Sequence, residues 1–258
     1  MKKVDAPWTF SSESFDVARV GELRRGHSIA VIVPAQNEAA TIGAVIDAAT
    51  FHGELVDQIV VVNDHSSDDT RAVATHHGAQ VVDLAGATGK GAALLAGLAA
   101  TRSEIVVFLD ADVLNTGVEY VARMIQPLLE HSEIHLVKGF YERPLHDMPT
   151  GGGRVNELTA RPILSLLYPG LGEIRQPLAG ETAARRDTLC ALGLESAYGV
   201  EIAMLIDVAL KYGVTSLAQV DLGIRRHRNR PLDELRPMAV EVLRAALERF
   251  DVPLPEGD

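Results

Sequence analysis

The stretch Val106-Val107-Phe108-Leu109-Asp110-Ala111-Asp112 joins a short apolar run to two acidic residues. The apolar run is typical of a strand buried on both faces of a parallel sheet. Two carboxylates directly after such a strand are costly unless a cation or solvent compensates them. A hard divalent ion that bridges Asp112 and diphosphate oxygens would do so. Asp-x-Asp is also common in helix caps and turns, so the prediction of a metal–diphosphate site depends on the rest of the chain.

The chain around this stretch alternates short β-branched runs with helical patterns, which is typical of a sheet covered on both faces. Strands are predicted over residues 29–33, 58–62, 79–83, 104–109, 134–141 and 216–222. Helices are predicted over residues 38–49, 69–77, 90–100, 118–129, 155–167, 201–212 and 235–250. The pattern therefore predicts an α/β fold.

The composition excludes several classes of protein. The 258 residues carry a net charge of −11, which argues against a nucleic-acid-binding surface. The apolar runs are too short to span a bilayer, and the first residues do not resemble a signal peptide. The one cysteine, Cys190, forms no disulfide framework; we expect it to be buried and the protein to be cytoplasmic.

Basic residues gather near the C-terminal end of the chain, at positions 225, 226, 227, 228 and 230. In an acidic protein such a segment creates a local field that attracts anions. A solvated charged surface is the alternative interpretation.

Polar residues follow several of the predicted strands, where open α/β sheets bind their ligands. Residues 34–38 (Pro-Ala-Gln-Asn-Glu) follow the first strand and Asn63-Asp64 the second. Lys90 stands between two glycines at the start of a helix, where the backbone can approach a phosphate or a nucleoside closely. The spacing is not that of a P-loop, and a surface lysine in a turn is the alternative.

Two sets of motifs carry a family resemblance. Residues 34–38, 62–68, 89–91 and 108–112 resemble the nucleotide-sugar half of a GT-A glycosyltransferase. Residues 152–155, 160–162, 176–181, 198–202 and 227–232 are similar to glucosyl-3-phosphoglycerate synthases, and the resemblance extends over residues 10–250.

This resemblance implies a Rossmann-like GT-A fold, with a mixed, mostly parallel sheet flanked by helices and a C-terminal acceptor-binding part. Residues 1–145 would bind the nucleotide sugar and residues 146–258 the acceptor, within one continuous domain. The implied reaction is a retaining transfer of glucose from UDP-glucose to the 2-hydroxyl group of 3-phosphoglycerate, with Mg²⁺ or Mn²⁺. The implied partners are thus a nucleotide-sugar donor and a small acidic acceptor, with no nucleic acid and no membrane.

The resemblance also implies roles for individual residues. The donor would contact Pro34, Ala35, Gln36, Glu38, Asp64, Lys90, Asp110, Ala111, Glu181 and Arg228. The acceptor would contact Gly153, Arg154, Asn156 and His227, while Asp112 and His227 would bind the metal. The catalytic residues would be Asp110, Glu201 and Arg154. The family commonly has Ser where this chain has Ala111, and Thr where it has Asn156.

Three of these roles have physical support and an alternative. Arg154 after three glycines can offer a bidentate fork beside free backbone N–H groups, or it can be an exposed side chain on a hinge. Arginines around His227 disfavour its protonated form, which suits a metal ligand, although a surface histidine is the alternative. Glu181 is either a carboxylate near the sugar or a residue at a helix N-terminus.

Other functions and assemblies stay open at this level. A retaining transferase that uses GDP-mannose, or one with a different acidic acceptor, has similar motifs. A regulatory nucleotide-binding module would lack Arg154, Glu201 and His227. An inverting polysaccharide synthase would usually need a C-terminal catalytic Asp and often membrane helices. Apolar residues recur at helical spacing in residues 235–247, where we expect core packing, while the resemblance favours a homodimer interface.

Overall fold

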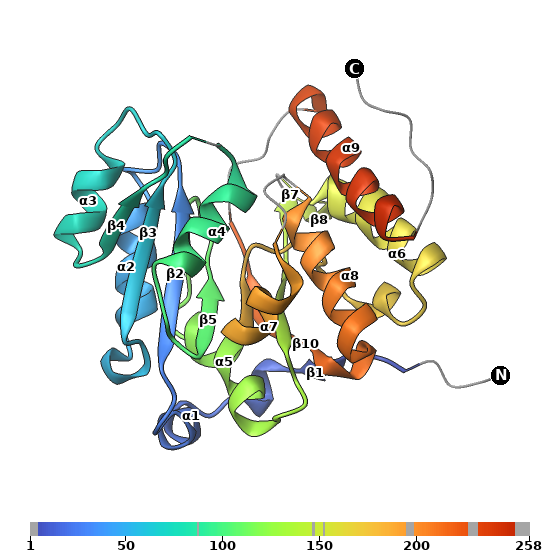
Figure 1. Cartoon of the computed structure of the whole chain (residues 1–258), viewed down its shortest axis with the longest axis horizontal. Coiled ribbons are helices and arrows are strands. Elements are labelled where there is room, and N and C mark those ends of the chain that lie inside the picture. The colour runs from blue at the N-terminus through green and yellow to red at the C-terminus, as the bar shows by residue number, and fades with distance from the viewer. Residues whose placement is uncertain are drawn as a thin grey trace.

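The computed structural model describes residues 5–86, 88–145, 148–151, 153–194, 199–226 and 232–250. In this part of the chain a sheet of eight strands has the order β1-β10-β6-β9-β5-β2-β3-β4 (Figure 1). These strands are β1 (Trp8–Phe10), β2 (Ile29–Ala35), β3 (Gln58–Asn63), β4 (Gln80–Asp83), β5 (Ile105–Phe108), β6 (Leu136–Glu142), β9 (Thr182–Arg185) and β10 (Leu217–Ile224). β7 (Pro144–Leu145) and β8 (Met148–Gly151) pair separately.

The sheet is mixed and mostly parallel, as the resemblance implies. β9 is the exception, because it runs antiparallel to both of its neighbours, β5 and β6. Strands from the first and second halves of the chain therefore share one hydrogen-bonded sheet.

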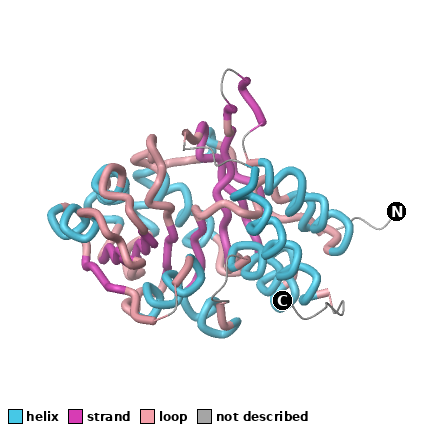
Figure 2. The backbone as a smooth tube through the Cα atoms, turned by 90° about the horizontal axis from the view of Figure 1, so that it is seen from above, coloured by secondary structure: helices cyan, strands magenta, loops and turns pink. Residues whose placement is uncertain are grey.

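Helices cover both faces of the sheet (Figure 2). One face carries α1 (Val17–Leu23), α2 (Ile42–Thr50), α3 (Thr70–His76) and α5 (Tyr120–Glu130). The other carries α4 (Lys90–Ala99), α6 (Arg161–Leu167), α7 (Arg186–Leu192), α8 (Val200–Tyr212) and α9 (Leu232–Arg249). None of the helices within the described ranges is long and apolar enough to cross a membrane.

The alternation of side chains along each strand creates two apolar cores. Val31 of β2 packs with Ile46 of α2 in one core, whereas the next residue, Ile32, packs with Leu94 of α4 in the other. Because both faces are covered, the inner strands are apolar along their whole length, as the sequence indicates.

The predicted strands and helices are confirmed in type, with shifts at their ends. Helix α2 begins at Ile42 instead of residue 38 because side chains at the start of α3 and just before it hold the preceding backbone. The Glu38 N–H donates to Thr70 Oγ1 at 2.8 Å, and the Ala39 N–H donates to Asp68 Oδ2 at 3.0 Å. The helix predicted from residue 155 starts as a π-helical turn, Asn156–Ala160.

Some elements were not predicted, and one expectation was wrong. β1, α1, β9 and α7 were not expected, because these short segments show no clear period. Cys190 on α7 is exposed rather than buried, since the side of this helix that packs inward presents Thr188 and Leu189.

Candidate active site at the carboxyl edge of the sheet

A cavity of about 380 Å³ opens at the carboxyl ends of β2, β3 and β5. Its lining combines the ends of these strands with the start of α4 and residues 110–112. Residues 153–156, the first turn of α8, Arg225 and one side of α9 complete it. Segments from both halves of the chain thus meet in one cavity.

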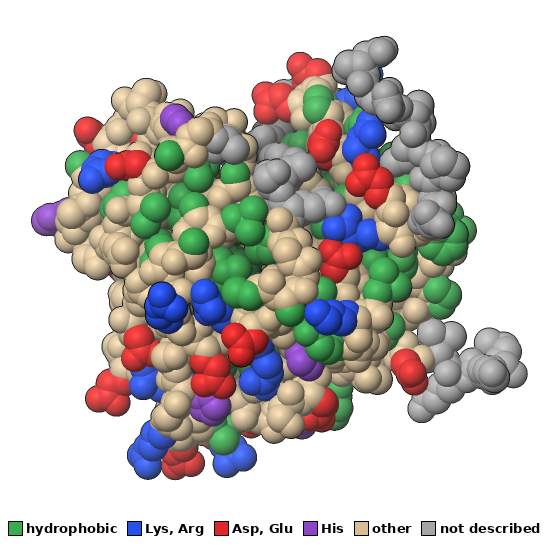
Figure 3. Space-filling view, viewed as in Figure 1, with side chains coloured by type: hydrophobic (Ala, Val, Ile, Leu, Met, Phe, Trp, Pro, Cys, Tyr) green, Lys and Arg blue, Asp and Glu red, His purple; other side chains and the backbone are tan. Residues whose placement is uncertain are grey.

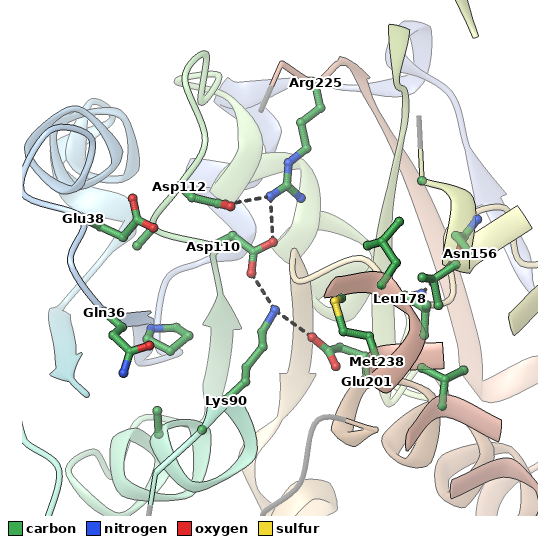
Figure 4. A pocket seen from close by; sticks show the side chains of 18 of the residues that line it. Gln36, Glu38, Lys90, Asp110, Asp112, Asn156, Leu178, Glu201, Arg225 and Met238 are labelled. Atoms are coloured by element: carbon green, nitrogen blue, oxygen red, sulfur yellow. Dashed lines mark hydrogen bonds and ion pairs between the residues drawn. The ribbon is translucent and has the colours of Figure 1, made fainter. Parts of the chain in front are cut away.

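The centre of this cavity is an ion-pair network around Lys90 (Figure 4). The Lys90 Nζ atom lies 2.6 Å from Asp110 Oδ1 and 2.7 Å from Glu201 Oε1. Asp110 follows β5 and Glu201 lies in the first turn of α8, so Lys90 joins the two halves of the chain. Burial disfavours the charge on Lys90, but the two carboxylates outweigh it and raise the pKa of Lys90 well above its usual value.

Arg225 is a second, deeper centre of charge, and its side chain is only 3% exposed. Its Nη2 lies 2.7 Å from Asp110 Oδ2 and 3.4 Å from Asp112 Oδ1. Its Nη1 lies 2.7 Å from Glu181 Oε2 and 2.6 Å from the Tyr141 hydroxyl. Burial disfavours this guanidinium charge, but the carboxylates of Glu181 and Asp110 outweigh it and raise the pKa of Arg225.

Asp110 is consequently held between two cations. Burial alone would raise its pKa, yet Lys90 and Arg225 together keep the pKa of Asp110 well below its ordinary range. Both carboxylate oxygens are engaged, one with each cation. Asp110 therefore stays ionised and is a poor nucleophile in this arrangement.

Eight of the predicted donor contacts line the cavity: Pro34, Ala35, Gln36, Glu38, Asp64, Lys90, Asp110 and Ala111. Asp64 also organises the turn before α4, because its Oδ2 accepts a hydrogen bond of 2.9 Å from the Gly89 N–H. The Gln36 Nε2 atom donates to the Asp64 carbonyl oxygen at 3.1 Å, which ties the ends of β2 and β3 together.

The predicted acceptor residues that the structure describes also line the cavity: Gly153, Arg154 and Asn156. Figure 4 shows Asn156 on the side away from Gln36 and Glu38. Asn156 is only 3% exposed, and its amide donates to the Arg175 carbonyl oxygen at 3.2 Å. Arg143, just after β6, lines the same side and was not predicted. Gly153 has a φ of 72°, a backbone conformation that favours glycine.

Glu181 lies apart from the other predicted donor contacts. It is 1% exposed, does not line the cavity, and pairs with Arg225 beneath it. His227 and Arg228 lie outside the described residues.

The apolar side chains of the last helix, α9, have two roles, since some pack in the core and others line the cavity. Ala245 and Ala246 of α9 pack in the core as predicted, whereas Met238 lines the cavity, and Leu235 lines the cavity while also packing against the core. Val242 does both. Met238 lies beside Glu201 in Figure 4, so α9 forms an apolar wall of the site.

The residues present fit a divalent cation at Asp112. Its carboxylate lines the cavity, and its side chain is 37% exposed, so a cation can reach it. Mg²⁺ usually takes one or two protein carboxylates and completes its shell with water and phosphate oxygens. Within the described ranges, no three His, Cys, Asp or Glu side chains group as metal ligands, and the predicted second ligand, His227, lies outside them.

The fold and the site together define a glycosyltransferase, and residues 30–159 match the family model described as Glycosyl transferase family 2. The glucosyl-3-phosphoglycerate synthase of Mycobacterium tuberculosis (strain ATCC 25618 / H37Rv) is 46% identical over 252 residues, 91% of this chain and 78% of the relative. The chain belongs to the glucosyl-3-phosphoglycerate synthase family, which confirms the resemblance.

Two further comparisons extend this relationship. The synthase of Petrotoga mobilis is 41% identical over 238 residues, 86% of this chain and 73% of the relative. The Mycobacterium tuberculosis enzyme in a crystal structure with Mn²⁺, UDP-glucose and phosphoglyceric acid is 41% identical. It has a TM-score of 0.87 and covers 98% of this chain and 89% of its own. A further crystal structure of that enzyme contains Mg²⁺ and UDP.

Proposed function

We propose that this protein transfers glucose from UDP-glucose to 3-phosphoglycerate in a metal-dependent reaction that retains the anomeric configuration. The observation that carries the proposal is the single cavity that joins the strand ends of the nucleotide-binding half to Gly153, Arg154 and Asn156. The substrates named for the Mycobacterium tuberculosis crystal structure support the choice of donor and acceptor.

Residues 1–145 would bind the donor and residues 146–258 the acceptor. Pro34, Ala35, Gln36, Glu38 and Asp64 would surround the nucleoside, and Lys90 would contact the nucleotide. Glu181 and Arg228 would complete the donor site. Glu181 would act indirectly, because it lies beneath the cavity and pairs with Arg225.

Arg154 would bind the phosphate or carboxylate of the acceptor, because a guanidinium group can hold either with two parallel hydrogen bonds. Gly153, Asn156 and His227 would shape this acceptor site. Arg143 lines the same side of the cavity and adds positive charge to it.

Asp112 and His227 would hold Mg²⁺ or Mn²⁺ at the diphosphate. The ion, when bound, supplies positive charge that stabilises the departing diphosphate. Arg225 contacts Asp112 and adds a fixed positive charge from the protein side.

Retention is best explained without a protein nucleophile. Both oxygens of Asp110 are engaged with cations, one oxygen of Glu201 contacts Lys90, and Glu181 lies outside the cavity lining. We therefore infer a displacement on one face of the sugar. The acceptor 2-hydroxyl oxygen bonds to the anomeric carbon, the bond to UDP breaks, and the hydroxyl proton passes to the leaving phosphate. Asp110, Glu201 and Arg154 would position the reactants.

A matrix of UDP- and GDP-sugars against 3-phosphoglycerate, glycerate and phosphoenolpyruvate, with Mg²⁺ and with chelator, tests the function. We expect turnover with UDP-glucose and 3-phosphoglycerate, loss of turnover in chelator, and an α-linked product by NMR. Preferred use of GDP-mannose would refute the donor, and glucosylation of another acid alone would refute the acceptor. Full activity in chelator would refute the metal dependence.

We also propose that the protein forms a homodimer in the cytoplasm. Large apolar side chains are exposed on the π-helical turn and α6, where Leu158 and Leu166 are 76% and 78% exposed. Figure 3 shows apolar side chains at the right-hand edge of the molecule in this view, in the region of α6. Sedimentation analysis tests this, because a monomer at micromolar concentration would refute the dimer. The sequence has one cysteine, Cys190, and so allows no disulfide within the chain, which supports a reducing location such as the cytoplasm.

A further inference from the structure

A lysine is fully buried in the middle of the sheet, below the proposed active site. Lys138 lies on β6, with Thr182 of β9 and Gln219 of β10 as its strand partners, and it is 1% exposed. A charge at such a position is costly, and an apolar side chain of the same volume often gives equal or greater stability. Lys138 therefore needs an explanation beyond packing.

The Lys138 ammonium group holds the turn that leads into β9. Its Nζ donates to the Ala179 carbonyl oxygen at 2.5 Å and to Thr182 Oγ1 at 2.8 Å. The two residues between these contacts are Gly180 and Glu181. Lys138 thus fixes both ends of a four-residue turn.

Both residues inside this turn contact the charged centre of the site. A Cβ atom at Gly180 would collide with the carboxylate of Asp110, so the backbone passes directly against that side chain. Glu181 holds Arg225 at 2.7 Å, and Arg225 in turn holds Asp110. A small shift of the turn would therefore displace Asp110.

We propose that Lys138 is a positioning residue for sugar transfer, which fixes residues 179–182 and through them Asp110 and Arg225. This inference rests on the proposed function, because Asp110 is the group that would face the transferred sugar.

The charged groups around Lys138 are Glu201 from α8, Lys90 from α4, Glu181 before β9 and Asp110 after β5. Burial lowers the pKa of Lys138 to about 8, and Glu201 opposes this effect.

The substitution Lys138→Met removes the charge and both hydrogen bonds at nearly constant volume. Gln219→Met is a matched control, because Gln219 is also buried, lies on the neighbouring strand, and bonds to Thr9, Glu173 and the Arg175 N–H rather than to residues 179–182. We expect Lys138→Met to lower kcat about a hundredfold, with both KM values within about threefold of wild type. Gln219→Met should keep kcat within about threefold even if it lowers the Tm equally.

The pH dependence provides a readout that a purely structural role would not change. As the pH rises from about 7 to about 9.5, a growing fraction of Lys138 becomes neutral, so the wild-type kcat should fall. An arginine at this position stays protonated over the same range, so the kcat of Lys138→Arg should not show this decline. This measurement also decides the question if Lys138→Met does not fold.

The two proposals fail separately. Wild-type protein that glucosylates no acceptor would refute the proposed function. If the wild type is active, three outcomes would each refute only the role of Lys138. These are a kcat of Lys138→Met close to wild type, an equal loss of kcat in Gln219→Met, and a wild-type kcat that stays level across this pH range.

Discussion

Lys90 and Glu201 form an ion pair of 2.7 Å across the cavity, one at the start of α4 and the other in the first turn of α8. The Glu201 side chain is 8% exposed, so the charges are poorly screened by water. Both residues line the cavity, so this contact joins the proposed donor and acceptor sides, and we expect it to lie near the transferred sugar.

The first prediction concerns this contact. Glu201→Gln keeps the shape of the side chain but removes its charge, so we expect kcat to fall by about ten- to a hundredfold. Donor affinity, measured by titration calorimetry with UDP, should change little. Glu248→Gln on the exposed side of α9 is the surface control. A fully active Glu201→Gln enzyme would remove the carboxylate from the mechanism.

Asp112 is predicted to be one of two metal ligands, together with His227. Asp112→Ala should weaken metal-dependent binding of UDP by at least about a hundredfold, while metal-independent binding stays close to that of wild type. Calorimetric titrations with Mg²⁺ and with chelator measure both quantities. Asp187→Ala, an exposed aspartate on α7, should behave as wild type. Equal Mg²⁺ enhancement in Asp112→Ala and wild type would place the ion elsewhere.

Gly180 is predicted to be intolerant of even a methyl group. In Gly180→Ala the new Cβ would meet the Asp110 carboxylate, which would have to leave Lys90 or Arg225, so we expect kcat to fall about a hundredfold.

Gly21→Ala in α1 is the matched control, because no atom lies within 4 Å of the added Cβ. This variant should keep full activity and gain about 0.5–1 kcal/mol in the free energy of unfolding. Wild-type kcat in Gly180→Ala would show that Asp110 can move without consequence.

Arg154 should affect the acceptor more than the donor. Arg154→Ala should raise the KM for 3-phosphoglycerate by about ten- to a hundredfold, because a charge-assisted hydrogen bond is lost, and leave the KM for UDP-glucose nearly constant. Arg161→Ala is the control within the same helical segment, since Arg161 pairs with Glu157 at the surface. If both KM values rose together, Arg154 would act on the cavity as a whole.

Apolar runs and strand ends made most of the sheet predictable. Residues after buried parallel strands must emerge at one edge, and Pro34, Asp64 and Asp110 accordingly line one cavity. β9 was not predicted because Thr182–Arg185 contains neither alternation nor a long apolar run.

Side-chain partners far apart in sequence were harder to predict. Arg225 was grouped with the basic residues that follow it in the sequence, although its position directly after a strand indicated the same edge as Asp110. Leu235 and Met238 show only helical spacing, which cannot distinguish core from cavity wall. A single lysine in an apolar strand, such as Lys138, gives no sign of which carbonyl it will meet.

The antiparallel strand β9 constrains how substrates can enter. It is hydrogen-bonded to β5 on one side and to β6 on the other, so it joins the later part of the chain, residues 146–258, to two strands of residues 1–145. A clamshell motion of the two halves would break these main-chain ladders along the middle of the sheet. Under the proposed function, we therefore expect entry of the sugar and release of the product to depend on the rim above the strands, with the floor of the site held by the sheet.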